Sequence, residues 1–227
     1  MPPTTRTGPP APHDSRWTAS FLAWPAALVL GVVAGLLHHR QGDFPEAYLV
    51  AESFFFRFAF FLAAVACGRA ASGVRQAVAA GLLLALGTHA ATTMVELLRG
   101  VPTDYALVQD LPDAVMHLLW TVALPLTGVL LACLTRREDL RGDLAAAALV
   151  QGQTIPAVVS LEQAARIEGC CVPVEWGYPW QDWIGLALSV ALVVLLRPAP
   201  GARLRSLVAA VALTGLIVGV STIPRWF

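Results

Sequence analysis

The feature that most limits what this chain can fold into is a series of apolar stretches, each close to twenty residues long. A helix of that length crosses the ~30 Å hydrocarbon layer of a membrane at a rise of about 1.5 Å per residue. Backbone amides and carbonyls find no water to bond in lipid, so such stretches must be helical. The pattern therefore predicts an all-α, polytopic membrane bundle with about seven transmembrane helices.

The predicted spans are defined by where the apolar stretches begin and end. They cover residues 21–37, 47–67, 77–98, 112–134, 144–165, 183–196 and 204–223. The sixth is short, and the second and fifth carry the most polar residues. Residues 1–18 are rich in proline and are expected to form a disordered cytoplasmic tail, which leaves residues 19–227 as a single transmembrane domain.

Composition supports the same class of protein. Hydrophobic residues make up 57% of the chain and charged residues 13%, whereas a soluble domain carries about a quarter charged residues. The net charge is zero, which argues against a nucleic-acid partner, because such partners require a basic face. The basic residues are all arginine, as coding bias in a high-GC bacterium produces. We therefore expect a multi-pass protein of a bacterial cell membrane, with the lipid bilayer as its surroundings.

The arginines are distributed unevenly between the two sets of loops. Ten lie in the tail and in the loops after the second, fourth and sixth spans, four lie on the other side, and Arg57 lies within a span. Because basic residues are retained on the cytoplasmic side, the N-terminus is predicted to be cytoplasmic and the C-terminus outside. That arrangement requires an odd number of spans, and seven satisfies it.

Two glycine pairs have the spacing that lets helix backbones approach closely in membranes. Gly31 and Gly35 form one such pair in the first span, and Gly215 and Gly219 form another in the seventh. Small residues at this spacing favour helix contacts either within one chain or between chains. A second copy of this chain or another membrane protein is therefore a candidate partner.

Arg57 is the most unusual residue within the predicted spans. It lies about ten residues into the second span, which is roughly 15 Å deep and close to the midplane. Placing an arginine there costs at least ~2.5 kcal/mol on insertion scales, so a partner is expected. Glu52, one turn nearer the outside on the same helix, is a candidate. An ion pair of this kind is either purely structural or part of a site.

Polar side chains recur on single faces of the third and fourth spans, at helical spacings of three or four residues. They are His89, Thr93 and Glu96 in the third span, and Asp113, His117 and Thr121 in the fourth. The fifth span adds Glu162 near its end. In the predicted orientation the acids and histidines lie in the outer half, Arg57 lies near the midplane, and the inner half is almost wholly apolar. The pattern predicts a polar funnel that opens to the outside.

The leading functional hypothesis is a site that binds or transports a small polar or anionic solute. Its candidate ligand-binding residues are Arg57, Glu52, His89, Glu96, His117 and Glu162. One alternative is an intramembrane enzyme that uses the two histidines and a carboxylate as acid and base. Another is a non-catalytic membrane scaffold or accessory subunit, in which each polar residue is satisfied by a neighbour.

Motifs that would specify a cofactor or a metal are absent from the sequence. There is no Walker A, GxSxG, GxGxxG, CxxCH, CxxC or HExxH pattern. No metal site is therefore predicted, and neither a cofactor nor a set of catalytic residues is assigned.

Overall fold

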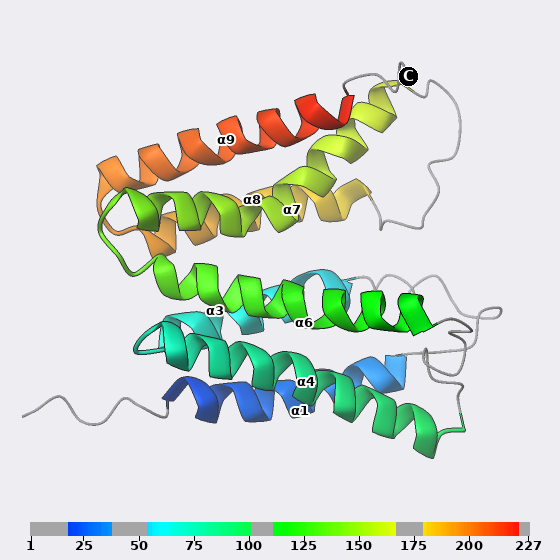
Figure 1. The fold of residues 1–227 in the computed structure, drawn as a ribbon. Coiled ribbons are helices and arrows are strands. Elements are labelled where there is room, and N and C mark those ends of the chain that lie inside the picture. Colours follow the sequence, from blue (N-terminus) through cyan, green and yellow to red (C-terminus); the bar gives the residue numbers. More distant parts are fainter. Residues whose placement is uncertain (1–17, 38–53, 101–110, 167–178, 223–227) are drawn as a thin grey trace, which may run out of the picture.

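The computed structural model describes residues 18–37, 54–100, 111–166 and 179–222, and every regular element among them is helical. In chain order these elements are α1 (Thr18–Leu37), the π-helix η2 (Phe55–Ala59), α3 (Phe60–Ala70), α4 (Val74–Leu98), α6 (Leu111–Leu134), α7 (Leu140–Arg166), α8 (Pro179–Leu196) and α9 (Pro200–Thr222) (Figure 1). The all-α class is confirmed for this part of the chain.

Three of the helices are long and apolar enough to cross a bilayer: Thr18–Leu37, Val74–Leu98 and the Pro200–Gly219 part of α9. Shorter apolar helices cover Phe60–Ala70, Thr121–Leu134 and Trp180–Leu196. All the helices fall on the apolar stretches identified in the sequence, although α3 continues from a π-helical turn that the pattern did not predict. The predicted tail lies outside the described residues except for Thr18, which is the first residue of α1.

The described helix ends have local causes in the sequence. After α3 the chain turns extended at Ala71, with φ −68° and ψ 131°. After α4 the backbone enters the left-handed region at Gly100, with φ 67°, a conformation that glycine adopts without steric cost. Pro198 follows α8, where proline disfavours continuation of a helix. These residues set the short connections that fold the chain back on itself.

Three short turns lie at one end of the bundle, where α1 also begins (Figure 1). They are residues 71–73 between α3 and α4, 135–139 between α6 and α7, and 197–199 between α8 and α9. Short connections of this length place consecutive helices antiparallel. Eight arginines lie in or beside these turns, and we call this region the arginine-rich end: Arg69, Arg75, Arg136, Arg137, Arg141, Arg197, Arg203 and Arg205.

Helices α1, α3, α4 and α6 pack through small side chains. Alanines at every fourth position of α1 are buried, beginning at Ala19, and belong to one core cluster with residues of the other three helices. The backbones of α1 and α4 approach so closely at Gly31 that a β-carbon there would clash with Ala91 and with the carbonyl oxygen of Thr88. The Thr92 hydroxyl donates to the Gly31 carbonyl oxygen at 3.2 Å. The first glycine pair therefore serves contacts within the chain.

Helices α7, α8 and α9 form the other side of the bundle (Figure 1). Ala147, Val150, Val193 and Ala210 form their shared core. A further cluster of residues from α3, α6, α7 and α8 joins the two sides: Val65, Ala132, Leu149, Leu192 and Leu196. The glycine pair of α9 differs from that of α1, because β-carbons built at Gly215 and Gly219 would meet no described atom within 4 Å.

Large apolar side chains cover much of the outside of the bundle. Phe21, Leu98, Leu195 and Val211 are each about three-quarters exposed, and many other leucines and valines are exposed to a lesser degree. Soluble proteins seldom expose contiguous apolar surface on this scale. The outer surface therefore has the chemistry of a protein surface that faces lipid.

Candidate functional site

The structure describes the six predicted ligand-binding residues to different extents. Glu52 lies outside the described residues, Arg57 lies in η2 and His89 and Glu96 lie on α4, while His117 on α6 and Glu162 on α7 are placed by their helices alone. Only the two α4 side chains are described. The convergence of the six residues on one cavity stays a prediction.

The backbone around Arg57 departs from α-helical geometry. Residues Phe55–Ala59 form a π-helix that continues directly into α3. A π-turn inserts an extra residue into the helical register, so that the local hydrogen-bond ladder is interrupted, and such turns are frequent at functional sites. The residue that the sequence singled out is thus at the centre of the described π-turn.

His89 and Glu96 lie on the flank of α4, seven residues apart and therefore on one face. Glu96 is 3% exposed, His89 is half-buried, and each interacts with another group. On the same helix a β-carbon at Gly81 would contact Leu126 of α6, which fixes how the two antiparallel helices are aligned. His89 lies eight residues after Gly81 on α4, and His117 lies nine residues before Leu126 on α6. Because the helices are antiparallel, the two histidines have their backbones at about the same distance from the Gly81–Leu126 contact along the bundle.

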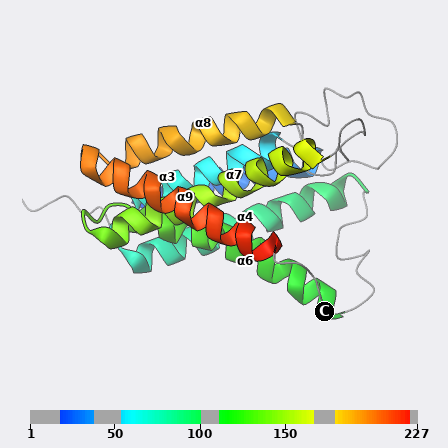
Figure 2. The same cartoon turned by 90° about the horizontal axis from the view of Figure 1, so that it is seen from above.

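Helices α4 and α6 diverge toward the end away from the arginine-rich turns, in both views of the bundle (Figures 1 and 2). His89 and Glu96 lie on the part of α4 that takes part in this divergence. Because the helices diverge, His89 and Glu96, which form the polar flank of α4, lie away from the tightly packed region around Gly81.

A second polar group lies between α7 and α9, where Gln151 and Thr214 are both buried. The Gln151 amide donates to the Ala147 and Ala210 carbonyl oxygens at 3.0 and 3.1 Å, and its oxygen accepts from the Thr214 hydroxyl at 2.8 Å. Thr154 adds contacts of 3.3 Å to the Gln151 oxygen and to the Thr214 hydroxyl. Because these groups satisfy one another, they form a clamp between two helices, with no donor or acceptor of Gln151 left over.

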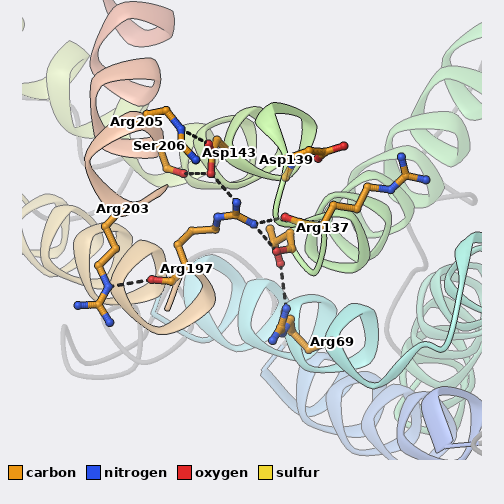
Figure 3. Close-up of polar contacts among 10 residues, drawn as sticks. Arg69, Arg137, Asp139, Asp143, Arg197, Arg203, Arg205 and Ser206 are labelled. Carbon is orange, nitrogen blue, oxygen red and sulfur yellow. Dashed lines mark hydrogen bonds and ion pairs between the residues drawn. The ribbon is translucent and has the colours of Figure 1, made fainter. Parts of the chain in front are cut away.

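The strongest described ionic interaction is at the arginine-rich end and is centred on Asp143, in the first turn of α7 (Figure 3). Its two carboxylate oxygens accept from Arg197 Nη2 at 2.5 Å and from Arg205 Nε at 2.6 Å. The Ser206 hydroxyl lies 3.5 Å from the first oxygen. Asp143 and Arg197 are almost fully buried, whereas the Arg205 side chain is 54% exposed.

Arg197 also closes the turn between α6 and α7. Its Nη1 donates to the carbonyl oxygens of Thr135, at 2.7 Å, and of Arg137. A β-carbon at Gly142 would collide with the Arg137 carbonyl oxygen and with Arg197 Nη1, so the residue before Asp143 must be glycine for the guanidinium to reach its partners. Arg197 therefore joins the ends of α6, α7 and α8.

The charge state of Asp143 reflects two opposing effects. Asp143 precedes the predicted apolar span 144–165, at the end of the bundle. Burial alone would raise the pKa of its carboxyl, but the hydrogen bonds from Arg205 and Arg197, with their positive charges, outweigh burial and hold the pKa below its usual range. Asp143 is therefore an ionised carboxylate that pairs with two arginines.

Contacts between turns continue toward α1. Arg69 Nη1 lies 3.4 Å from the Thr135 hydroxyl, and Arg136 Nη1 donates to the Ala71 carbonyl oxygen. Thr18 at the start of α1 donates to the Ala70 carbonyl oxygen at 2.9 Å. The polar contacts thus connect the ends of α1, α3, α6, α7, α8 and α9 and tie the two sides of the bundle together.

Among the described residues no group of three or more histidine, cysteine or acidic side chains is placed to hold a metal ion. No family model matches the chain, and the searches of curated proteins and of solved structures found no match. The functional argument therefore depends on this chain's own residues.

The role of Asp143 was not predicted from the sequence. The arginines near the turns indicated only an orientation, and no structural partner was predicted for any of them. One signal was present, because Asp143 follows a glycine at the start of an apolar stretch and is an acid close to several arginines in the sequence. Its pairing with Arg197 and Arg205, more than fifty residues away, depends on tertiary structure.

Proposed function

We propose that this chain is a seven-span integral membrane protein that binds a small polar or anionic solute in a cavity opening away from the arginine-rich end. In this proposal the arginine-rich end faces the cytoplasm, the C-terminus lies outside, and Arg57 forms the floor of the cavity. The candidate wall residues are Glu52, His89, Glu96, His117 and Glu162.

The observation that carries the proposal is the π-turn at Arg57. The sequence places this cation near the midplane of a span, and the backbone there independently leaves α-helical register. Transporter sites near the midplane are typically built from interrupted helices whose backbone groups are available to a ligand. A cation on such a turn suits a carboxylate or a similar anion.

The two ends of the bundle support a direction of access. The arginine-rich end has short turns closed by the contacts of Arg197, Arg136 and Arg69. The opposite end carries the polar flank of α4, and there α4 and α6 diverge (Figure 2). A solute that reaches Arg57 therefore has its simplest route from the opposite end.

Cysteine accessibility on α4 tests the proposal. In a variant whose four native cysteines are replaced, Thr93→Cys should react with a charged, impermeant thiol reagent added to intact cells, because residue 93 lies on the predicted cavity flank. Two matched positions on the same helix should stay unreactive: Ala90→Cys, which faces outward at similar depth, and Leu84→Cys, which is fully buried. Equal reactivity at 90 and 93, or none at 93, would reject the cavity.

Arg57 is tested by ligand binding to the purified protein. Small carboxylates and inorganic phosphate, tried in turn, should raise the melting temperature of the wild type and protect Thr93→Cys from the reagent. Arg57→Gln should lose both effects, and Arg57→Lys should keep part of them, because lysine preserves the charge without the bidentate geometry. The same response in Arg57→Gln and wild type would remove Arg57 from the site.

A non-catalytic membrane scaffold is the second candidate, and the α7–α9 clamp favours it. Gln151, Thr154 and Thr214 satisfy one another without a ligand, as a purely structural set of polar residues would. The side of α9 at Gly215, where no described atom lies within 4 Å of an added β-carbon, leaves room for a helix of another chain. Absence of labelling at Thr93→Cys would favour this candidate.

A further inference from the structure

Arg69 and Arg136 each contact the chain segment beside the other at the arginine-rich end. Arg69, in the last turn of α3, reaches the Thr135 hydroxyl, and Arg136, in the turn after α6, reaches the Ala71 carbonyl oxygen. The contacts are reciprocal, so each guanidinium lies beside the turn that carries the other. Each uses only one of its terminal nitrogens on a described partner, which leaves donors for another group.

This pair of cations has no carboxylate partner within the described ranges. Asp143 is occupied by Arg197 and Arg205, and Asp139 accepts from the Gly142 amide. Burial, and then the charges of Arg136 and Arg197, lower the pKa of Arg69, which lies beyond the predicted span 47–67. Like charges on neighbouring guanidinium groups repel each other, and an anion bound between them would relieve that repulsion.

The surface below Arg69 points to the kind of anion. Leu62 and Ala66 lie seven and three residues before Arg69, so the three residues share one face of α3. All three are exposed, and Leu62 is 42% exposed. This face is apolar for about 10 Å along the helix and then ends in a guanidinium. An acyl chain fits the apolar part, and a phosphate fits the end.

We propose that the arginine-rich end binds an anionic phospholipid, with its phosphate between Arg69 and Arg136 and an acyl chain along Leu62 and Ala66. Guanidinium groups bind phosphate through paired charge-assisted hydrogen bonds, and basic pockets between helices on the cytoplasmic side suit such headgroups. The inference rests on the membrane placement proposed above and not on the solute cavity. The phosphate of the bound lipid supplies a negative charge between the two guanidinium groups.

Lipid retention by the full-length protein tests this site. The purified protein would be exchanged into neutral detergent, supplied with dioleoylphosphatidylglycerol or dioleoylphosphatidylcholine, and analysed by native mass spectrometry and thermal denaturation. The wild type should retain phosphatidylglycerol preferentially and melt at a higher temperature with it. Arg69→Gln and Arg136→Gln should each lower that affinity roughly tenfold, because each removes one charge-assisted contact.

Arg75→Gln is the matched control. Arg75 is an exposed arginine in the first turn of α4 at the same end, with no described contact to either member of the pair. It should leave lipid retention unchanged. Equal losses in Arg75→Gln and Arg69→Gln would show a diffuse attraction to surface charge and overturn the site, as would full retention in Arg69→Gln.

Two further measurements complete the test. Inorganic phosphate at millimolar concentration should not reproduce the stabilisation, because it lacks the acyl chain; equal stabilisation would identify a free-anion site and overturn the lipid assignment. If Arg69→Gln does not fold, Arg69→Lys replaces it, because lysine keeps the charge; its lipid affinity should fall between those of wild type and Arg136→Gln. Lipid retention equal to wild type in both Arg69→Lys and Arg136→Gln would reject the proposal. Labelling at Thr93→Cys reports on the solute cavity separately, so either proposal can fail alone.

Discussion

The two sides of the bundle are held together by different kinds of contact. Helices α1, α3, α4 and α6 associate through alanine and glycine, with backbones in direct contact at Gly31. Helices α7, α8 and α9 associate around buried polar groups, with Gln151 in the middle and Asp143 at the end. In lipid, apolar surface alone does not draw helices together, so both close packing and polar contacts are used for this purpose.

The difference between the two sides determines what each tolerates. A side built on small residues is sensitive to volume, because any added atom has to displace a neighbouring backbone. A side built on polar contacts is sensitive to loss of one partner, because the remaining group is left buried and unsatisfied. Substitutions on the two sides therefore separate these mechanisms.

The largest effect is expected for Asp143→Ala. The substitution leaves Arg197 buried without its carboxylate, and removing one partner of a buried ion pair costs about 3–5 kcal/mol. Denaturation in detergent would measure the loss. Asp139→Ala removes an exposed carboxylate just before α7, together with its contact to the Gly142 amide, and should cost less. Replacing Arg197 by methionine in the Asp143→Ala background should recover part of the loss, and similar stabilities for the two single variants would contradict the role of Asp143.

Acid should weaken the same interaction without mutation. Because the pKa of Asp143 is lower in the folded protein than in the unfolded chain, its stabilisation is fully present above the unfolded value of about 3.9 and is lost as the pH falls through the folded value. The stability difference between wild type and Asp143→Asn should be constant above about pH 5 and should shrink below about pH 4. Shrinkage already near pH 6 would mean that the folded pKa is raised.

On the other side, Gly31→Leu should cost about 1–3 kcal/mol, as overpacking does in a close contact. The added side chain has to displace Ala91 and the Thr88 backbone of α4. Gly215→Leu is the matched control in the second glycine pair, where no described atom lies within 4 Å, and the monomer should tolerate it. Equal costs for the two variants would imply that α9 is covered by another helix.

The helices were predictable because their signal is local. Apolar length decides where a spanning helix can form. It gave the last residues of α1 and α4 as observed and placed their first residues three positions too late. The π-turn at Phe55–Ala59 was not predictable, because hydrogen-bond register inside a helix leaves no trace in hydrophobicity. Helical periodicity also placed His89 and Glu96 on one face correctly, since it depends only on their spacing.

Partners across helices were beyond the sequence. Periodicity shows which residues share a face of their own helix but not which neighbour that face meets. The two glycine pairs have the same spacing in the sequence, so both predicted a close helix contact. In the structure Gly31 packs against α4, whereas no described atom lies within 4 Å of a β-carbon built at Gly215. In the same way, Arg197 and Arg205 predicted only an orientation, and their shared contact with Asp143 depends on how α7, α8 and α9 pack.

A smaller effect is expected in the clamp between α7 and α9. Thr214→Val removes the hydroxyl that donates to the Gln151 oxygen at 2.8 Å while keeping the side-chain shape. Hydrogen bonds between membrane helices average about 0.6 kcal/mol in double-mutant cycles. A cycle combining Thr214→Val with Gln151→Leu should give a coupling near that value, measured by denaturation in detergent. Zero coupling would mean that the two residues do not interact in the membrane.

The smallest effect is expected for Arg205→Gln, although Arg205 contacts the same carboxylate as Arg197. Its side chain is 54% exposed, so water and salt screen its charge, and exposed ion pairs contribute about 0.2–1 kcal/mol. Arg197 is buried and also holds the Thr135 carbonyl oxygen, so Arg197→Gln should be several times more costly. Raising the salt concentration should reduce the Arg205 contribution and leave that of Arg197 nearly unchanged, because ions reach only the exposed pair. The two partners of one carboxylate would then differ because Arg197 is buried and holds carbonyl oxygens as well, whereas Arg205 is exposed. A cost of Arg205→Gln that is the same at low and high salt would show that exposure has no part in the weakness of the Arg205 contact.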